Sequence, residues 1–412
     1  MDAGPARAAA ERVARESYGK LVAFLTKRMR DMSLAEDALS DAFAAALRTW
    51  PARGIPDSPE AWLLTAAKRR ALDDVRRRKR QKETEPHVTL MADEIAATSA
   101  RDIPDERLAL MFACAHPAID AAMHAPLILQ SVLGFDAATI ASAFLISPAT
   151  MGQRLVRAKA RIRGTGIPFR VPERDELRPR LDGVLEAIYA AYTEGWSDPA
   201  GTDAHRRNLA LEAIWLGRLV ASLLPDEPEA LGLLALMLHA EARREARRNV
   251  GGEFVPLAEQ DTSLWSDESI AEAESLLRRA GEMNVIGRFQ LEAAVQSAHA
   301  IRRRTGVADW GAILSLYDAL YAITGSAVVA INRAVALAET EGPTAALAAL
   351  DALAATKLEQ YQPYWAARAE FLARCGRVQD ADGAYAQAIG LESDPAVRRF
   401  LQHKRASLAA RP

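Results

Sequence analysis

Basic side chains gather at one end of a predicted helix, where they are suited to holding an anionic polymer. The stretch LDDVRRRKRQK, residues 72–82, contains five consecutive basic residues, 76–80. Such a run is a solvated helix face, a localisation signal or a contact for nucleic-acid phosphates, and composition alone leaves all three open. Helical spacing places Arg69, Arg76 and Arg80 on one face. The candidate nucleic-acid contacts of this helix are Lys68, Arg69, Arg76, Arg77 and Arg80.

A second basic helix is predicted over SPATMGQRLVRAKARIR, residues 147–163. Ser147 suits the N-cap, and Pro148 suits the first helical position. The preceding short pattern, DAATIASAFL, together with a tight turn, makes this order typical of a helix-turn-helix. Side chains near the start of the second helix can reach base edges, and later ones phosphates. The base-edge candidates are Thr150, Gln153, Arg154 and Arg157, the phosphate candidates include Lys159 and Arg161, and the predicted buried residues are Met151, Leu155 and Ile162.

An acidic patch lies on another predicted helix, MSLAEDALSDAFAAALRTW, residues 32–50. It consists of Glu36, Asp37 and Asp41. Ser33 is the predicted N-cap, and Glu36 stands three residues later, as in a capping box. The patch is either a docking surface for a basic partner or a solvated face in which Glu36 only caps the helix. Helical spacing predicts a buried stripe of Leu39, Phe43, Leu47 and Trp50.

No combination of residues points to catalysis, so we expect neither an enzyme nor a cofactor. Cys114 and His116 are close in sequence, but a metal needs more ligands than these two. The sequence shows neither a phosphate-binding glycine loop of the Walker type nor a nucleophile elbow. The least helical segment of the second half, GGEFVPLAEQDTSLW (251–265), either lines a site or braces its neighbours, and bracing is favoured. Its polar and aromatic candidates are Glu253, Glu259, Gln260, Asp261 and Trp265.

Length, composition and charge describe a soluble chain with two electrically different parts. The 412 residues are enough for two or three domains. The composition, 50% hydrophobic and 26% charged, is typical of a soluble globular protein. There is no apolar run of membrane-spanning length and no apolar signal segment, and cysteine is scarce. We therefore expect a cytoplasmic protein without a membrane contact. Residues 1–174 hold 27 Lys and Arg against 21 Asp and Glu, a net charge of +6, and the remainder has −8. This asymmetry indicates a nucleic-acid-facing first part and an acidic second part, unless it arose by drift.

Helical periodicity extends over almost the whole sequence, which predicts an all-α fold. The first helix is expected over about 7–30, and a polar, mildly acidic linker over 83–103. Near the end, one unit has the residue offsets of a tetratricopeptide repeat, and Ala346 lies 35 residues before Ala381 in a weaker copy. The better unit comprises Trp365, Ala369, Leu372, Gly376, Ala381, Tyr385 and Ala388. Because a lone repeat cannot bury its face, other helices should stack on it.

The order of these parts resembles the extracytoplasmic-function (ECF) group of the sigma-70 family. AEDALSDAFAAAL (35–47) resembles region 2.2, PEAWLLTAAKRRALDDVRRRKR (59–80) resembles regions 2.3 and 2.4, and GFDAATIASAFLISPATMGQRLVRAKARIR (134–163) resembles region 4.2. Four later segments resemble the subgroup with a tetratricopeptide-like C-terminal extension: GIPFRVP, GGEFVPLAEQDTSLW, AINRAVALAETEGP and RAEFLARCGR. The implied domains are region 2 (1–82), a linker (83–103), region 4 (104–172) and the extension (173–412).

The resemblance implies a transcription initiation factor. Region 2 would bind the β′ clamp helices of RNA polymerase core through Glu36, Asp37 and Asp41, and would capture the minus-ten element. Region 4 would bind the minus-thirty-five element and the β flap. The extension would regulate, with an intramolecular contact to regions 2 and 4 as one route. Ser40, Arg69, Thr139 and Thr262 depart from the family pattern. A competing hypothesis is a helix-turn-helix regulator with a helical-repeat sensor domain that does not join polymerase.

Overall fold

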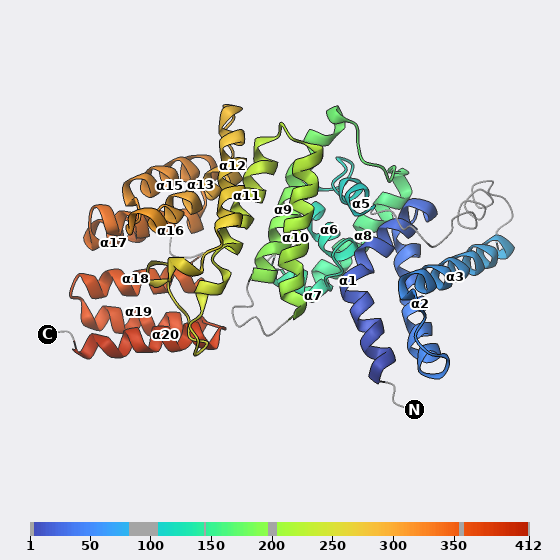
Figure 1. Cartoon of the computed structure of the whole chain (residues 1–412), viewed down its shortest axis with the longest axis horizontal. Helices are drawn as coiled ribbons and strands as arrows, with labels where there is room; N and C mark the ends of the chain where they lie inside the picture. Colours follow the sequence, from blue (N-terminus) through green and yellow to red (C-terminus); the bar gives the residue numbers. More distant parts are fainter. Residues whose placement is uncertain (1–3, 82–105, 144–145, 197–203, 354–357, 411–412) are drawn as a thin grey trace. The chain divides into compact units, whose positions relative to one another are not determined.

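The computed structural model confirms an all-α fold. It describes residues 4–81, 106–143, 146–196, 204–353 and 358–410. In these ranges the regular structure is helical, apart from one isolated antiparallel bridge between Arg248 and Phe254. Figure 1 shows the succession of helices along the chain. The predicted linker, 83–103, lies outside the described residues.

The chain divides into two compact units whose boundary falls inside one helix. The first unit contains the helices up to α9 (Arg174–Trp196) and the part of α10 (Ala204–Leu223) that ends at Leu216; the second begins at Gly217. The sequence placed a domain boundary at 172/173 instead. The difference has a packing cause, because α9 lies against α5 (Arg107–Cys114) and α6 (His124–Ser131) and buries its apolar side chains there.

Three helices form the start of the first unit, the N-terminal bundle: α1 (Gly4–Met29), α2 (Met32–Arg53) and α3 (Pro59–Gln81). They pack pairwise on one another. The predicted stripe of α2 is partly wrong: Leu39 and Trp50 are buried, but Phe43 is half-buried and Leu47 is 48% exposed. Alanines take the inner face, which lets the helices approach closely; the buried ones in α2 are Ala35, Ala38, Ala42 and Ala46.

The start of α2 also differs from the prediction. Asp31, not Ser33, is the N-cap, and its Oδ1 accepts a hydrogen bond from the Leu34 amide at 3.1 Å. Glu36 therefore takes no part in a capping box, and its carboxylate can bind a side chain of another helix. At the other end, α2 continues through Pro51 and stops before Gly54, whose φ of 86° suits glycine.

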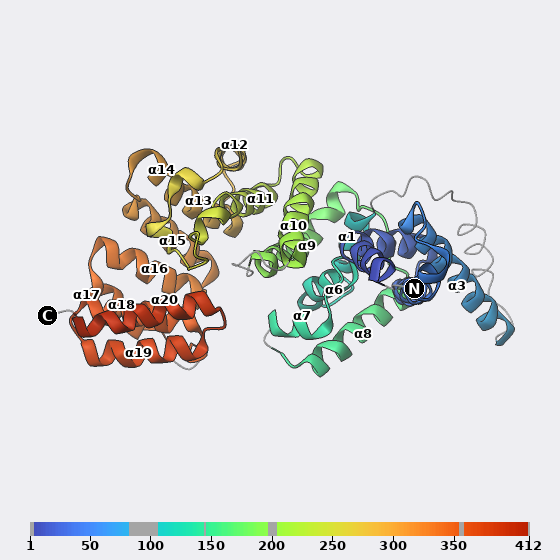
Figure 2. The same cartoon turned by 60° about the horizontal axis from the view of Figure 1, so that its bottom comes forward.

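The second part of the first unit, the α5–α8 group, contains the predicted pair of short helices. These are α7 (Ala137–Ala143) and α8 (Pro148–Thr165), which pack on each other and on α6 (Figure 2). The predicted cap of α8 is confirmed, because the Ser147 hydroxyl accepts from the Thr150 amide at 3.2 Å. The predicted inner face of α8 is also confirmed, since Met151, Leu155 and Ile162 are buried.

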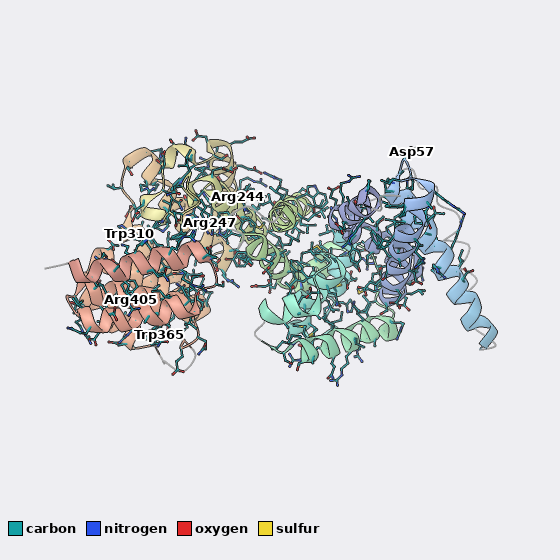
Figure 3. The ribbon with its side chains drawn as sticks, turned by 90° about the horizontal axis from the view of Figure 1, so that it is seen from below. Asp57, Arg244, Arg247, Trp310, Trp365 and Arg405 are labelled. Carbon is teal, nitrogen blue, oxygen red and sulfur yellow. The ribbon has the colours of Figure 1, made fainter. Side chains whose placement is uncertain are left out.

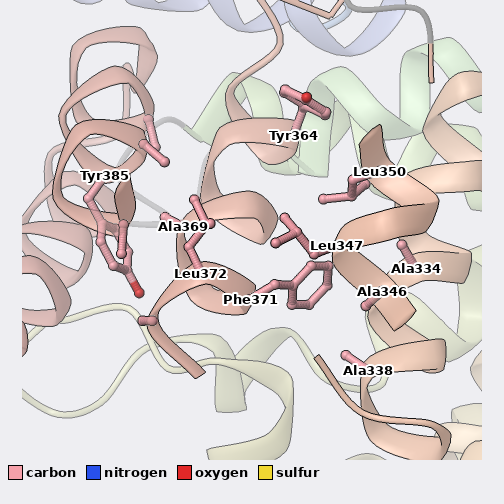
Figure 4. Close-up of a cluster of buried hydrophobic side chains, with 14 of the residues drawn as sticks. Ala334, Ala338, Ala346, Leu347, Leu350, Tyr364, Ala369, Phe371, Leu372 and Tyr385 are labelled. Atoms are coloured by element: carbon pink, nitrogen blue, oxygen red, sulfur yellow. The ribbon is translucent and has the colours of Figure 1, made fainter. Parts of the chain in front are cut away.

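The second unit is built from α11 to α20, whose last helices share one apolar core (Figure 4). In the described part of the chain, the α-helices after α10 are α11 (Pro228–Glu241), α12 (Asp267–Glu282), α13 (Arg288–Ala300), α14 (Arg302–Thr305), α15 (Trp310–Thr324), α16 (Ala327–Thr340), α17 (Pro343–Asp351), α18 (Gln362–Arg374), α19 (Val378–Leu391) and α20 (Pro395–Ala406). Most positions of the predicted repeat lie in this core, including Ala369, Leu372, Ala381, Tyr385 and Ala388. Gly376 has a φ of 74°, which places a glycine-favouring turn between α18 and α19.

The segment 251–265 is braced by two arginines, as favoured from the sequence. The Arg302 guanidinium donates to the carbonyls of Leu257 at 2.7 Å and Gln260 at 2.6 Å. Arg303 donates to the Trp265 carbonyl at 2.8 Å. Charged donors thus bind three backbone carbonyls of this irregular segment, of which the Leu257 carbonyl also accepts from the Gln260 amide at 3.4 Å.

Replacing Arg302 tests this bracing. Arg302→Ala leaves two carbonyls without their charged donor, so we expect it to lower the free energy of unfolding of the second unit by about 2–4 kcal/mol. Arg304→Ala is the matched control, because Arg304 is exposed on the same short helix; its effect should stay within about 0.5 kcal/mol. Urea denaturation measures both, and equal effects would contradict the assigned role of Arg302.

Two histidines of the second unit are held in their neutral form by burial. Burial, with Arg243 nearby, lowers the pKa of His239 to about 4. Burial, with Arg243 and Arg302, lowers the pKa of His299 to about 4. The His299 ring packs edge-on against Trp310, which Figure 3 labels, with ring centroids 5.5 Å apart.

These histidines should make the second unit sensitive to acid. Their folded pKa of about 4 lies below the ordinary value of 6.5. Their contribution is therefore complete above pH 6.5 and is lost as the pH falls toward 4, because the unfolded chain binds protons first. We expect a loss of about 2 kcal/mol for each histidine between pH 7 and pH 5. Urea denaturation at both values should show a weaker pH dependence in His239→Leu, but not in His403→Leu, which alters an exposed ring.

Candidate nucleic-acid interface

The outer face of α8 presents a row of arginines. Arg154, Arg157 and Arg161 are exposed and follow each other at intervals of three and four residues, so they share one side of the helix. Thr150 and Gln153 are exposed near its start. The Thr150 hydroxyl lies 2.7 Å from the Ser147 hydroxyl, so the Thr150 side chain is hydrogen-bonded to the N-cap residue. The structure thus brings together five of the six candidates predicted for this helix.

The three arginines line a groove of about 680 Å³. Its opposite wall is residues 118–123, a segment that ends in the short 3-10 helix η1 (Ala121–Met123) before α6. Ile119, Met123 and Ala158 supply buried apolar surface at the groove. Asp120 is the acidic residue of this lining, and its carboxylate accepts from the Ala122 amide at 3.1 Å. Positive charge therefore dominates the groove, which suits an anionic polymer at its mouth.

The sixth candidate of α8, Lys159, lies on a different face. Its Nζ is 2.6 and 2.8 Å from the two carboxylate oxygens of Glu36 on α2. The Ser131 hydroxyl also donates to Glu36, at 2.9 Å. The side chains of Lys159 and Glu36 are only 11% and 17% exposed. Each was predicted to contact another macromolecule, and in this structure they are paired with each other.

The remaining acidic candidates stay accessible. Asp37 and Asp41 are exposed on α2. Arg70 of α3 approaches Asp41, with Nε 3.9 Å from Oδ2. The acidic patch therefore consists of two available carboxylates rather than three.

The basic helix α3 carries candidates of two kinds. Lys68 is half-buried, with Nζ 5.6 Å from the centroid of the Phe24 ring, and burial together with Arg28 lowers its pKa. Its aliphatic stem is thus part of the packing of α3 on α1. Arg69 is exposed. The helix continues through Arg76, Arg77 and Arg80, but their side chains lie outside the described residues.

In the described part of the chain, no three His, Cys, Asp or Glu side chains lie close enough together to bind a metal ion. This includes the surroundings of Cys114 and His116. Cys114 is fully buried, and burial raises the pKa of its thiol. His116 accepts a hydrogen bond from the Ala118 amide at 3.1 Å. Both residues belong to the packing of the α5–α6 connection.

Comparison with known proteins gives the N-terminal bundle a family. The family model described as "Sigma-70 region 2" matches residues 13–81, which fold into α1–α3. Residues 13–81 thus match a sigma-70 region 2 domain, which supports a place for the chain in the sigma-70 family. Region 2 of sigma-70 proteins implies binding to RNA polymerase core and promoter DNA. A second model, "Family of unknown function (DUF6596)", matches residues 180–281.

The chain also has a relative of nearly the same length. "Uncharacterized protein R00370" of Rhizobium meliloti (strain 1021) is 37% identical over 397 residues, covering 94% of this chain and 93% of the relative. None of the solved structures matches the chain significantly. Among the described residues, every helix is too short or too polar to cross a membrane.

Sequence reasoning missed three participants of this region. The groove wall at 118–123 carries no charge pattern that marks it. Asp31 and Arg163 approach each other, with Nη1 3.7 Å from Oδ2, across 132 residues of sequence. The pairing of Glu36 with Lys159 spans 123 residues. The sequence signal in α8 was the helical spacing of its apolar residues. This spacing predicted the buried face of the helix but not the residue with which Lys159 pairs.

Proposed function

We propose that this sigma-70 family chain is an RNA polymerase sigma factor of the ECF type. Its α1–α3 bundle, as region 2, binds polymerase core and captures the minus-ten element of the promoter. Its α5–α8 group, as region 4, reads the minus-thirty-five element. The family match over 13–81 supports the first role, and the two exposed carboxylates of α2, Asp37 and Asp41, supply its docking charge.

The observation that carries the second role is the arginine row of α8. A helix that follows a short partner helix, begins at a capped serine and exposes Gln153 and three arginines matches what major-groove recognition requires. Arg154 and Arg157 are placed to read bases, and Arg161 to hold a phosphate. The chain acts here by binding and performs no catalysis of its own, since polymerase supplies the chemistry.

The second unit regulates this activity in our proposal. Residues 217–412 hold 25 Asp and Glu against 21 Lys and Arg, and this acidic excess favours contact with basic surfaces. Its stacked helices offer a broad scaffold for another protein. Activation and inhibition are both compatible with this role.

Charge reversal on α2 tests the polymerase contact. Asp37→Lys with Asp41→Lys places positive charge against the basic surface expected on the β′ clamp helices, so capture by purified core polymerase should weaken at least about tenfold. Asp57→Lys is the matched control (Figure 3), because Asp57 is an equally exposed carboxylate in the α2–α3 connection. A regulator that never joins polymerase would show no capture by any of these proteins.

Salt dependence of promoter binding tests the division of work on α8. Arg161→Ala should weaken binding to all promoter sequences alike and reduce the slope of log affinity against log salt by about 1, because one phosphate contact is lost. Arg154→Ala should instead relax base preference at one position, a change of about 1–3 kcal/mol. Binding of the chain with core polymerase to promoter fragments measures both. An unchanged salt slope for Arg161→Ala would contradict the phosphate assignment.

A further inference from the structure

Two cations from different helices share one aromatic ring in the N-terminal bundle. The guanidinium carbon of Arg28 on α1 lies 3.6 Å from the centroid of the Phe24 ring, and the Nζ atom of Lys68 on α3 lies 5.6 Å from the same point. The Phe24 ring is buried, whereas Arg28 and Lys68 are half-buried. Because the face of an aromatic ring attracts cations, α1 and α3 bring two positive groups together at one place.

This placement concentrates positive charge at the contact between α1 and α3. Burial, together with Arg28, lowers the pKa of Lys68, so the two cations disfavour each other's charge. Arg69, next to Lys68 on α3, is exposed, and so is Arg30, just after the end of α1. An anion that contacted both Arg28 and Lys68 would offset their repulsion. Ionisable groups held under such mutual stress are frequent at binding sites.

A packing role explains only part of this arrangement. Arg28 lies in the last turn of α1, where a cation suits the helix dipole, and its guanidinium covers Phe24. An apolar side chain at position 28 would cover the ring equally well without repelling Lys68. A guanidinium whose carbon lies against a ring keeps its N–H donors at its edge, where they can bind a further acceptor.

The ligand chemistry that fits these two cations is a phosphate group of a polymer. A phosphodiester presents anionic oxygens that can accept hydrogen bonds from a guanidinium edge and from an ammonium group at the same time. Basic residues continue along α3 after Lys68, with Arg69 next to it and the run 76–80 near the end of the helix. A series of cations along one helix suits a ligand whose phosphates repeat, and a nucleic-acid strand is such a ligand.

We propose that Arg28 and Lys68 form a cradle for one backbone phosphate of a single nucleic-acid strand, with Arg69 beside it. The role of the cradle in transcription rests on the proposed function, because it would hold the opened strand from which the N-terminal bundle captures the minus-ten element. It adds a contact from α1, a helix for which the sequence predicted none. A phosphate contact carries no base information, so the cradle positions the strand and leaves the choice of sequence to other residues.

The salt dependence of binding to a labelled oligonucleotide tests the cradle. The probes are a fluorescent single strand of mixed sequence and the corresponding duplex, since phosphate contacts need no particular sequence. Fluorescence anisotropy measures their binding to the full-length chain over a series of salt concentrations. Arg28→Met removes the charge but keeps a side chain over Phe24. We expect it to weaken binding of the single strand about tenfold and to reduce the slope of log affinity against log salt by about 0.7, the value of one single-strand phosphate.

A matched control separates the cradle from a general loss of positive charge. Arg12 is an exposed arginine of the same helix, about 24 Å before Arg28 at 1.5 Å per residue. Arg12→Met should change the affinity less than about twofold and leave the salt slope unaltered, because it removes the same charge away from the cradle. Arg28→Lys restores a cation and should recover most of the slope. Equal effects of Arg28→Met and Arg12→Met, or a larger effect of Arg28→Met on the duplex than on the single strand, overturn the proposal.

Combination with Lys68→Gln tests whether the two cations hold the same phosphate. Each single change should reduce the salt slope by about 0.7, and the double variant should show about the same total reduction, because one contact is lost in all three proteins. A reduction of about 1.4 in the double variant would mean that two separate phosphates are bound, and it would overturn the cradle.

The cradle and the proposed function can fail separately. A chain that is captured by core polymerase but keeps its single-strand affinity and salt slope in Arg28→Met retains the sigma assignment and overturns the cradle. Single-strand binding that depends on Arg28, in a chain that core polymerase does not capture, supports the phosphate contact and refutes the proposed function. Absence of single-strand binding by the wild-type chain at low salt also overturns the cradle.

Discussion

The ion pair between Glu36 and Lys159 constrains the arrangement of the whole first unit. Both charges are largely buried, so α2 and α8 must stay in register with each other and with Ser131 of α6. The closeness of α1 to α6 at Gly19 follows from the same packing. α9 also packs on α5 and α6. Helices that are far apart in the sequence thus form one compact unit.

This constraint divides the basic residues of α8 between two tasks. Lys159 and Arg163 face the N-terminal bundle, whereas Arg154, Arg157 and Arg161 face a groove that is open to solvent. One helix thus contributes both to holding the unit together and to its candidate nucleic-acid surface. The acidic helix α2 is divided in the same way, since Glu36 is paired inside and Asp37 and Asp41 remain outside.

Local features could be predicted from the sequence, and long-range pairings could not. The cap at Ser147 and the inner face of Met151, Leu155 and Ile162 depend on neighbouring residues, and both predictions are confirmed. The sequence did not predict the exposure of Leu47, because helical spacing favours the face with the largest apolar side chains. The structure instead buries a face of α2 that is rich in alanine, which lets the helices pack closely. The cap at Asp31 freed Glu36 to bind Lys159, 123 residues away, and no local pattern encodes that separation.

The measurement that tests the account most directly is run-off transcription with purified cognate core polymerase and the full-length chain. The template would be a library randomised at the two promoter elements. The account predicts that core alone gives no discrete start, and that adding the chain yields discrete transcripts from templates enriched in one sequence at each element. Transcripts indistinguishable from those of core alone would contradict the assignment of this chain as a sigma factor.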